Sequence, residues 1–198
     1  MHAGGLQTVS SDAENVYLIG PMGSGKTTVG QRVAKLLGLD FFDCDQELEA
    51  QTGASVSLIF DLEGEEGFRD RETRMLEQLT SRRGVLVATG GGVVLRRHNR
   101  ELLRRNGLVV YLSTPVNHQL RRLSRDRTRP LLQNGDRKER LARLAAQRNP
   151  LYSELAAIEF PSQNRGLDVT ARALADLIRA HWKQADGKGH GSPGESES

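Results

Sequence analysis

Short apolar runs alternate with stretches of helical periodicity along most of this chain. The apolar runs predict five buried strands, at residues 16–19, 39–42, 85–88, 108–112 and 158–160. Helical patterns separate them, at residues 27–37, from the second strand to about residue 79, and at 99–106, 115–125 and 168–182. Strands that alternate with helices are typical of an α/β domain with a parallel sheet, and this is the predicted fold class.

The first helical pattern has an apolar face and a defined end. Val29, Val33, Leu36 and Leu37 recur at helical spacing and are predicted to share one face. Gly38 follows them and is expected to end the helix, because glycine readily adopts the left-handed conformation found there.

The two ends of the chain lack this periodicity. Residues 1–14 and 184–198 are polar, and we expect them to be disordered tails on either side of one domain, residues 15–183. A length of 198 residues fits a single domain with a substantial core.

Composition indicates a soluble globular protein, with 37% apolar and 27% charged residues. No apolar stretch approaches the ~20 residues that span a bilayer, so no membrane partner is expected. The first residues have neither the basic start nor the apolar core of a signal peptide, and the single cysteine, Cys44, excludes an internal disulfide framework. A cytoplasmic protein is therefore expected.

Positive charge is concentrated in one segment. The formal net charge is +3, yet residues 121–148 contain nine arginines and one lysine against three acids. Such a block could bind nucleic acid, surround a small polyanion or form a solvated helix face, and it contains no aromatic residue on which single-stranded bases would stack. Pro130 keeps Arg129 extended, and Asn134 with Gly135 favours a turn, so residues 121–137 predict a mobile basic lid.

The strand at 16–19 leads into the sequence GPMGSGKTTVG. Residues 20–27 match the pattern G-x-x-x-x-G-K-[ST], whose backbone amides surround nucleotide phosphates at the start of a helix. Gly23 and Gly25 let the amides turn inward, Lys26 can reach the outer phosphates, and the Thr27 hydroxyl can ligate Mg²⁺. An ordinary glycine-rich turn is the alternative.

Two aspartates follow the second strand, and three glycines, residues 90–92, follow the third. If the strand geometry continues, Asp43 and Asp45 point to opposite sides, one towards metal-bound water and the other towards an acceptor hydroxyl. Alternatively, Asp45 caps the next helix. The glycines would admit a ligand or form a tight turn. Because ligands of parallel sheets bind beyond the carboxyl ends of the strands, these segments and the phosphate loop should converge at one edge.

Arg69 lies beside an apolar helical stripe that contains Phe68, Met75, Leu76 and Leu79. It could form a surface ion pair with Glu72, one turn along, or bind a carboxylate with its planar guanidinium. The residues alone leave both open. Cys44 lies between two aspartates that raise the pKa of a thiol, so it is not expected to act as a nucleophile. The five histidines show no metal-ligand spacing.

Six motifs occur in one order over about residues 16–177: GPMGSGKTTVG, FFDCDQELE, GEEGFRDRE, ATGGGVV, RPLL and RNPLY. In these the chain resembles the shikimate kinases. The resemblance implies a three-layer fold like that of the P-loop nucleoside monophosphate kinases, with a five-stranded parallel sheet and a mobile lid. It also implies transfer of phosphate from ATP to the 3-hydroxyl of shikimate, on the way to chorismate and the aromatic amino acids.

The resemblance also implies residue roles. Lys26, Asp45 and Arg129 would be catalytic, with Asp45 binding shikimate hydroxyls and accepting the proton. Mg²⁺ would be held by Thr27 directly and by Asp43 through water. The ATP-binding residues would be Gly23, Ser24, Gly25, Lys26, Thr27, Thr28, Arg122, Arg129 and Arg165, with Arg122 and Arg165 near the adenine. Shikimate would be bound by Asp45, Arg69, Gly91, Gly92 and Arg148, the two arginines holding its carboxylate.

The chain departs from the family pattern after the third strand, which ends in Ala88 and Thr89 without the expected acid; Asp43 stands in for it. Where many members have serine, Thr27 keeps the hydroxyl. We expect a monomer that binds neither nucleic acid nor membrane. The alternatives are a kinase for gluconate or another hydroxy acid, a GTP switch with D-x-x-G at residues 61–64 but no N-K-x-D segment, and a basic nucleic-acid-binding ATPase.

Overall fold

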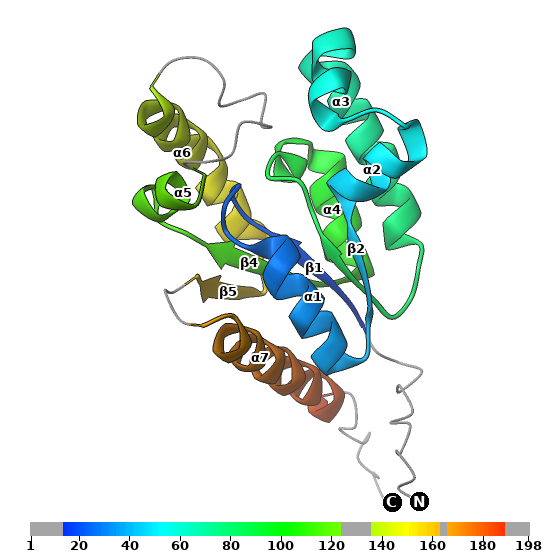
Figure 1. Cartoon of the computed structure of the whole chain (residues 1–198). Coiled ribbons are helices and arrows are strands. Elements are labelled where there is room, and N and C mark those ends of the chain that lie inside the picture. Colours follow the sequence, from blue (N-terminus) through cyan, green and yellow to red (C-terminus); the bar gives the residue numbers. More distant parts are fainter. Residues whose placement is uncertain (1–13, 124–135, 163–165, 189–198) are drawn as a thin grey trace, which may run out of the picture.

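Five parallel strands form the centre of the structure (Figure 1). The computed structural model describes residues 14–123, 136–162 and 166–188. The strands of this part pair in the order β2-β3-β1-β4-β5, and every pair is parallel. They are β1 (Asn15–Ile19), β2 (Asp40–Asp43), β3 (Val85–Ala88), β4 (Gly107–Ser113) and β5 (Ile158–Pro161). The predicted α/β class with a five-stranded parallel sheet is confirmed, and no strand end differs from its predicted position by more than one residue.

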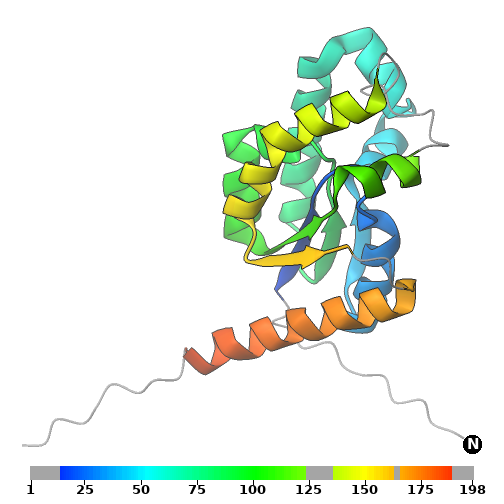
Figure 2. The ribbon, with the colours of Figure 1, turned by 90° about the vertical axis from the view of Figure 1, so that its left-hand side faces the viewer.

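Helices cover both faces of the sheet (Figures 1 and 2). On one face α1 (Lys26–Leu37) packs along α7 (Leu167–Lys188). The other side carries α2 (Cys44–Thr52), α3 (Val56–Thr80), the short 3₁₀ helix η1 (Val93–Leu95), α4 (Arg97–Asn106) and α6 (Arg137–Leu155). The remaining helix, α5 (Val116–Leu123), packs against α6. This arrangement gives the three layers that the resemblance implies.

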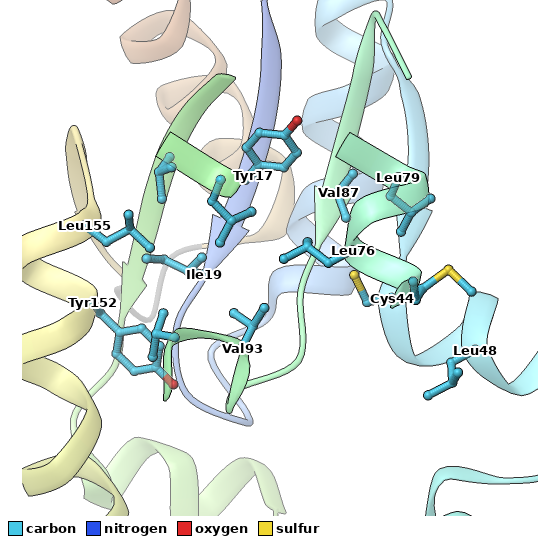
Figure 3. Close-up of a cluster of buried hydrophobic side chains, with 14 of the residues drawn as sticks. Tyr17, Ile19, Cys44, Leu48, Leu76, Leu79, Val87, Val93, Tyr152 and Leu155 are labelled. Carbon is cyan, nitrogen blue, oxygen red and sulfur yellow. The ribbon is translucent and has the colours of Figure 1, made fainter. Parts of the chain in front are cut away.

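Alternation along β1 places its side chains in two separate clusters of the core. Val16 and Leu18 pack with α1 and α7, whereas Tyr17 and Ile19 point into the cluster of the opposite face, because successive side chains of a strand point to opposite sides. Figure 3 shows the second cluster, in which Tyr152 of α6 also takes part. The phosphate loop therefore leaves a strand that is buried on both faces.

Three expectations about the helices were wrong. The apolar face of α1 contains Val29, Val33 and Leu37 as predicted, together with Ala34, but Leu36 is 39% exposed and lines a groove between α1 and α7. The helical stretch after β2 is two helices, separated where Gly53 takes up a left-handed conformation (φ 68°). The final helix continues to Lys188, beyond the expected domain end at residue 183.

Helix α6 is not among the helices predicted from the sequence. Asp136 caps this helix, accepting hydrogen bonds from the amides of Lys138 and Glu139, and Leu141 and Tyr152 are buried along it. Its basic residues and the internal Pro150 obscured the helical pattern. Lys138 and Arg143 are exposed on this helix. For these two residues of the basic block, the alternative of a solvated helix face is correct.

Candidate functional site

The loop between β1 and α1 has the backbone that a phosphate-binding loop needs. Gly23 (φ 75°) and Gly25 (φ 93°) adopt positive φ values that favour glycine, and Gly25 is the N-cap of α1. A Cβ at Gly20 would lie 2.7 Å from the carbonyl oxygen of Leu112. The loop can therefore follow only a narrow path, with the N-terminus of α1 at its end, where unpaired amides and the helix dipole favour an anion.

Lys26 holds this loop together from inside. Its Nζ donates hydrogen bonds to the carbonyl oxygens of Gly20 (2.8 Å) and Pro21 (2.9 Å), and Ser24 Oγ lies 3.5 Å away. Ser24 is fully buried and does not line the cleft in front of the loop. Lys26 itself lines the cleft, together with Thr27 and Thr28 of the first turn of α1.

Thr27 and Asp43 form a pair of oxygen donors at the loop. The Thr27 hydroxyl donates to Asp43 Oδ2 at 2.6 Å. Asp43 Oδ1 accepts from the amides of Asp45 (3.0 Å) and Gln46 (3.3 Å), so Asp43 is the N-cap of α2. Within residues 14–123, 136–162 and 166–188, no cluster of three or more His, Cys, Asp or Glu side chains could hold a metal ion.

These contacts correct two expectations about the aspartates. Because β2 ends at Asp43 and α2 begins at Cys44, the alternation of a strand does not continue to Asp45, and both carboxylates line the same cleft. The cap of α2 is Asp43 and not Asp45. As expected, the pKa of the Cys44 thiol is raised, by burial first and by the carboxylate of Asp45 second.

Two residues of α3, Arg69 and Glu72, form a buried ion pair. Arg69 Nη1 and Glu72 Oε2 are 2.7 Å apart, and their side chains are 5% and 2% exposed. Burial raises the pKa of Glu72, which the charge of Arg69 only partly offsets. Burial alone would lower the pKa of Arg69, but the carboxylates of Glu72 and Glu65 outweigh it and raise that pKa. Of the two alternatives for Arg69, the ion pair with Glu72 is present, but it is buried and not on the surface.

The three glycines after β3 make room for this pair. A Cβ at Gly90 would overlap Glu72 Oε1, and one at Gly92 would overlap the guanidinium of Arg69. Of the three, only Gly91 would accept a Cβ without overlap, with its nearest neighbours at an ordinary contact distance of 3.5 Å. The glycines thus admit the protein's own charged side chains at two positions, and a ligand could approach the third.

Arg148 of α6 lines a small pocket together with Arg69 and Glu72. It is 5% exposed, and burial lowers its pKa. One turn along, the Tyr152 hydroxyl donates to the carbonyl oxygen of Gly91, and its ring stacks on Tyr111 of β4 at 5.0 Å between centroids. Sequence reasoning missed Tyr152, and it treated Glu72 only as an ion-pair partner. The apolar spacing from Leu141 to Tyr152 could have revealed the helix that carries the tyrosine.

This pocket contains polar atoms that the described part of the chain leaves unsatisfied. Arg69 Nε, Arg148 Nε and Glu72 Oε1 are buried and have no hydrogen-bond partner among the described residues. Unpaired buried polar groups are costly, so two donors and an acceptor around one pocket indicate a polar ligand. A small organic acid with hydroxyl groups would supply complementary partners.

Two hollows meet at Asp45. The larger, a cleft of about 610 Å³, is lined by the phosphate loop and by Asp43, Thr89 and Arg122. The smaller, of about 50 Å³, is lined by Arg69, Glu72, Arg148, the three glycines and an apolar wall. Both are also lined by Met22, Asp45, Val56 and Gly91. The three strand-end segments therefore converge at one edge of the sheet, as predicted.

The residues expected near the adenine and in the lid are only partly described. Arg122 Nη1 donates to the carbonyl oxygens of Gly23 (3.0 Å) and Ser24 (3.2 Å) and to Ser162 Oγ (3.0 Å), so it braces the phosphate loop. Arg129 and Arg165 lie outside the described residues. Of the predicted lid, residues 121–123 belong to α5 and Arg137 begins α6, while residues 124–135 are not described.

Comparison with known proteins yields one family. Residues 22–178 match the family model described as shikimate kinase. A shikimate kinase of Pasteurella multocida is 48% identical over 169 residues, which cover 85% of this chain and 97% of that protein. The structure of a shikimate kinase from Acinetobacter baumannii in complex with shikimate superimposes with a TM-score of 0.83 at 47% identity, covering 86% of this chain and 96% of that one. A gluconokinase from Sinorhizobium meliloti shares the fold alone, with a TM-score of 0.55 at 18% identity over 86% of this chain and 97% of that one.

Lys26→Ala should abolish nucleotide use without unfolding the protein. We expect phosphoryl transfer to fall by at least about 100-fold, because the change removes the positive charge of the loop and the two hydrogen bonds that Nζ donates to its carbonyls. ADP production at saturating ATP, with circular dichroism as a check of folding, measures this. Lys35→Ala, on the exposed side of the same helix, is the matched control and should keep full activity. Near-normal turnover of the Lys26 variant would exclude the nucleotide assignment.

Proposed function

Because the chain belongs to the shikimate kinase family, we propose that it transfers the γ-phosphoryl group of ATP to the 3-hydroxyl of shikimate, giving shikimate 3-phosphate and ADP. The observation that supports this best is the position of Asp45, which lines both the cleft at the phosphate loop and the small pocket of buried arginines. An acceptor hydroxyl in the pocket and a terminal phosphate in the cleft would meet beside this carboxylate.

In this proposal the site residues have three roles: they bind the phosphates, bind the acceptor and accept its proton. The amides at the start of α1 and the ammonium of Lys26 bind and neutralise the phosphates, which is the main requirement of phosphoryl transfer. Arg69 and Arg148 bind the carboxylate of the acceptor, and the backbone at Gly91 and Gly92 positions its ring. Asp45 orients the acceptor hydroxyl and accepts its proton. Arg129 and Arg165 complete the ATP site in this proposal.

The donor set at the phosphate loop fits Mg²⁺. A hydroxyl and a carboxylate 2.6 Å apart are the hard oxygen groups that this ion prefers, and phosphates and water would complete its shell. Thr27 would hold the ion directly and Asp43 through water, standing in for an acid after β3. When bound, Mg²⁺ would neutralise charge that develops on the phosphates.

The rival functions have less support. A gluconate kinase would have no need of Asp45, Arg69 and Arg148 together, and the gluconokinase structure shares only the fold. The D-x-x-G segment of a GTP switch falls inside α3. The basic block supplies Arg148 to the pocket and Arg122 to the phosphate loop, so it needs no nucleic acid to account for it.

We also propose that the protein acts as a monomer in the cytoplasm. Every helix among the described residues is too short or too polar to cross a bilayer. The absence of membrane and nucleic-acid partners is part of the same proposal.

A coupled assay of ADP release with different acceptors tests the proposed function. We expect saturable turnover with shikimate and Mg·ATP, and only background release with gluconate, with nucleoside monophosphates and with single-stranded DNA. The Lys26→Ala variant serves as the blank for contaminating activity. Faster release with gluconate than with shikimate, or release that requires DNA, would replace the proposal by the corresponding rival.

Changing Arg69 or Arg148 to lysine should weaken acceptor use specifically. Lysine keeps the charge but loses the planar fork, and one charge-assisted hydrogen bond contributes roughly 1.5–3 kcal/mol, so kcat/KM for shikimate should fall by about tenfold to a hundredfold. ATP binding without shikimate should not change. Arg143→Lys, on the exposed face of α6, is the matched control.

The double variant should lose less than the sum of the single losses, since both arginines act on one carboxylate. Shikimate binding by calorimetry and steady-state kinetics give the two measurements. If both single variants bind shikimate normally, Arg69 is only the partner of Glu72 and the carboxylate site lies elsewhere.

Asp43→Asn should raise the Mg²⁺ concentration needed for half-maximal activity by about tenfold, because it removes a negative charge near the ion. Asparagine is also a good helix N-cap, so the melting temperature should change little. Activity is titrated with Mg²⁺ at constant ATP, and Asp40→Asn, at the exposed start of β2, is the control. An unaltered Mg²⁺ requirement would exclude Asp43 from the metal site.

A further inference from the structure

Helix α3 is interrupted at a single residue. Gly64 has φ 71° and ψ −175°, which is not helical, whereas the residues on either side of it continue the helix. This combination of angles is essentially restricted to glycine. It divides α3 into a shorter part, residues 56–63, and a longer part, residues 65–80, which we call the first half and the second half.

The two halves form opposite parts of the small pocket beside Asp45, which we call the acceptor pocket because the acceptor is proposed to bind there. Val56 and Phe60 come from the first half, and Phe68, Arg69 and Glu72 come from the second. The rings of Phe60 and Phe68 meet across the break, with centroids 4.5 Å apart. The backbone conformation of Gly64 therefore sets the distance between the apolar side chains of the first half, Val56 and Phe60, which we call the apolar wall, and Arg69. Arg69 is the buried arginine that is proposed to bind the carboxylate.

One ion pair outside the pocket bridges the break. Arg71 donates from Nε to Glu63 Oε2 at 2.8 Å and from Nη2 to Glu63 Oε1 at 2.7 Å. Such a bidentate pair fixes orientation as well as distance. Both side chains are 36% exposed, and neither lines the acceptor pocket. We call Glu63 and Arg71 the α3 clasp.

The surroundings of Glu63 are fitted to this contact. A Cβ at Gly67 would overlap the Cβ of Glu63, so a glycine there lets the end of the first half lie against the second half. The hydrogen bonds from Arg71 lower the pKa of Glu63, and the charge of nearby Arg74 acts in the same direction. The carboxylate is therefore ionised at neutral pH, and two arginines of the second half face it.

We propose that Glu63 and Arg71 are positioning residues, whose clasp across the Gly64 break holds the apolar wall of the acceptor pocket at the distance that a small ring acid requires. The inference rests on the proposed function, because it assigns the clasp to acceptor binding. Without the clasp, the first half of α3 is still held by buried Ile59 and by the hydrogen bond from the Val56 amide to Glu49, but it loses the ion pair across Gly64. Its orientation is then less restricted, and binding of the acceptor must order it. The loss should appear in acceptor affinity, because exposed ion pairs contribute little to overall stability.

Kinetics of clasp variants test the proposal in the full chain. Glu63→Gln removes the charge that faces both Arg71 and Arg74, and Arg71→Gln removes the fork. Each should raise the KM for shikimate by about twofold to fivefold, with the KM for ATP and the melting temperature nearly unchanged. The double variant should be no worse than either single variant, because the two residues act as one unit. Arg97→Gln, which breaks the exposed Arg97–Glu101 pair on α4, is the matched control.

Hydrogen exchange provides a readout that does not depend on turnover. Amides of residues 53–63 should exchange faster in Glu63→Gln than in the wild type without any ligand, and those of α4 should not change. Wild-type protein that fails to phosphorylate shikimate would contradict the proposed function, and the exchange data would still test the clasp. Active wild type combined with clasp variants that have an unchanged or lower KM for shikimate, or with additive effects in the double variant, would overturn the inference.

Discussion

The site depends on one constraint, which is that all five strands of the sheet are parallel. Parallel neighbours need a crossover connection, so each strand returns through a helix and every strand-to-helix turn emerges at the same edge. Here β1 ends in the phosphate loop, β2 in Asp43 and β3 in three glycines. Because β3 lies between β1 and β2, these three turns are neighbours, and the cleft exists only because the strands are ordered in this way.

The pocket next to the cleft depends on buried charge. Arg69 and Glu72 compensate each other at 2.7 Å, which makes their burial tolerable, since an isolated buried charge would be very costly. They fit only because Gly90 and Gly92 have no side chains, so α3 and the end of β3 are matched to each other. The unsatisfied atoms that remain on Arg69, Glu72 and Arg148 define what a ligand must supply.

Two helices tie this pocket to the rest of the molecule. Through Tyr152, α6 holds the carbonyl of Gly91, and it presents Arg148 from the same side. Through its break at Gly64, α3 places apolar and charged residues around one space, with the α3 clasp bridging the break from outside. The acceptor pocket is therefore assembled from segments that lie between Met22 and Arg148, whereas the phosphate loop is one continuous stretch.

The amino-acid sequence predicts the strands, the phosphate loop and the strand-end position of Asp43 correctly, because apolar periodicity and glycine spacing express preferences that act within a few neighbouring residues. It named Arg69 and Arg148 through resemblance, but it left open whether Arg69 was a surface ion pair. The folded structure was needed to show that Arg69 is buried with Glu72, that Gly90 and Gly92 enclose them, and that Tyr152 belongs to the site. Likewise, it showed Asp43 as the cap of α2 and Leu36 as exposed. Burial and charge pairing of these side chains depend on which distant segments pack together, and a local pattern carries little information about that.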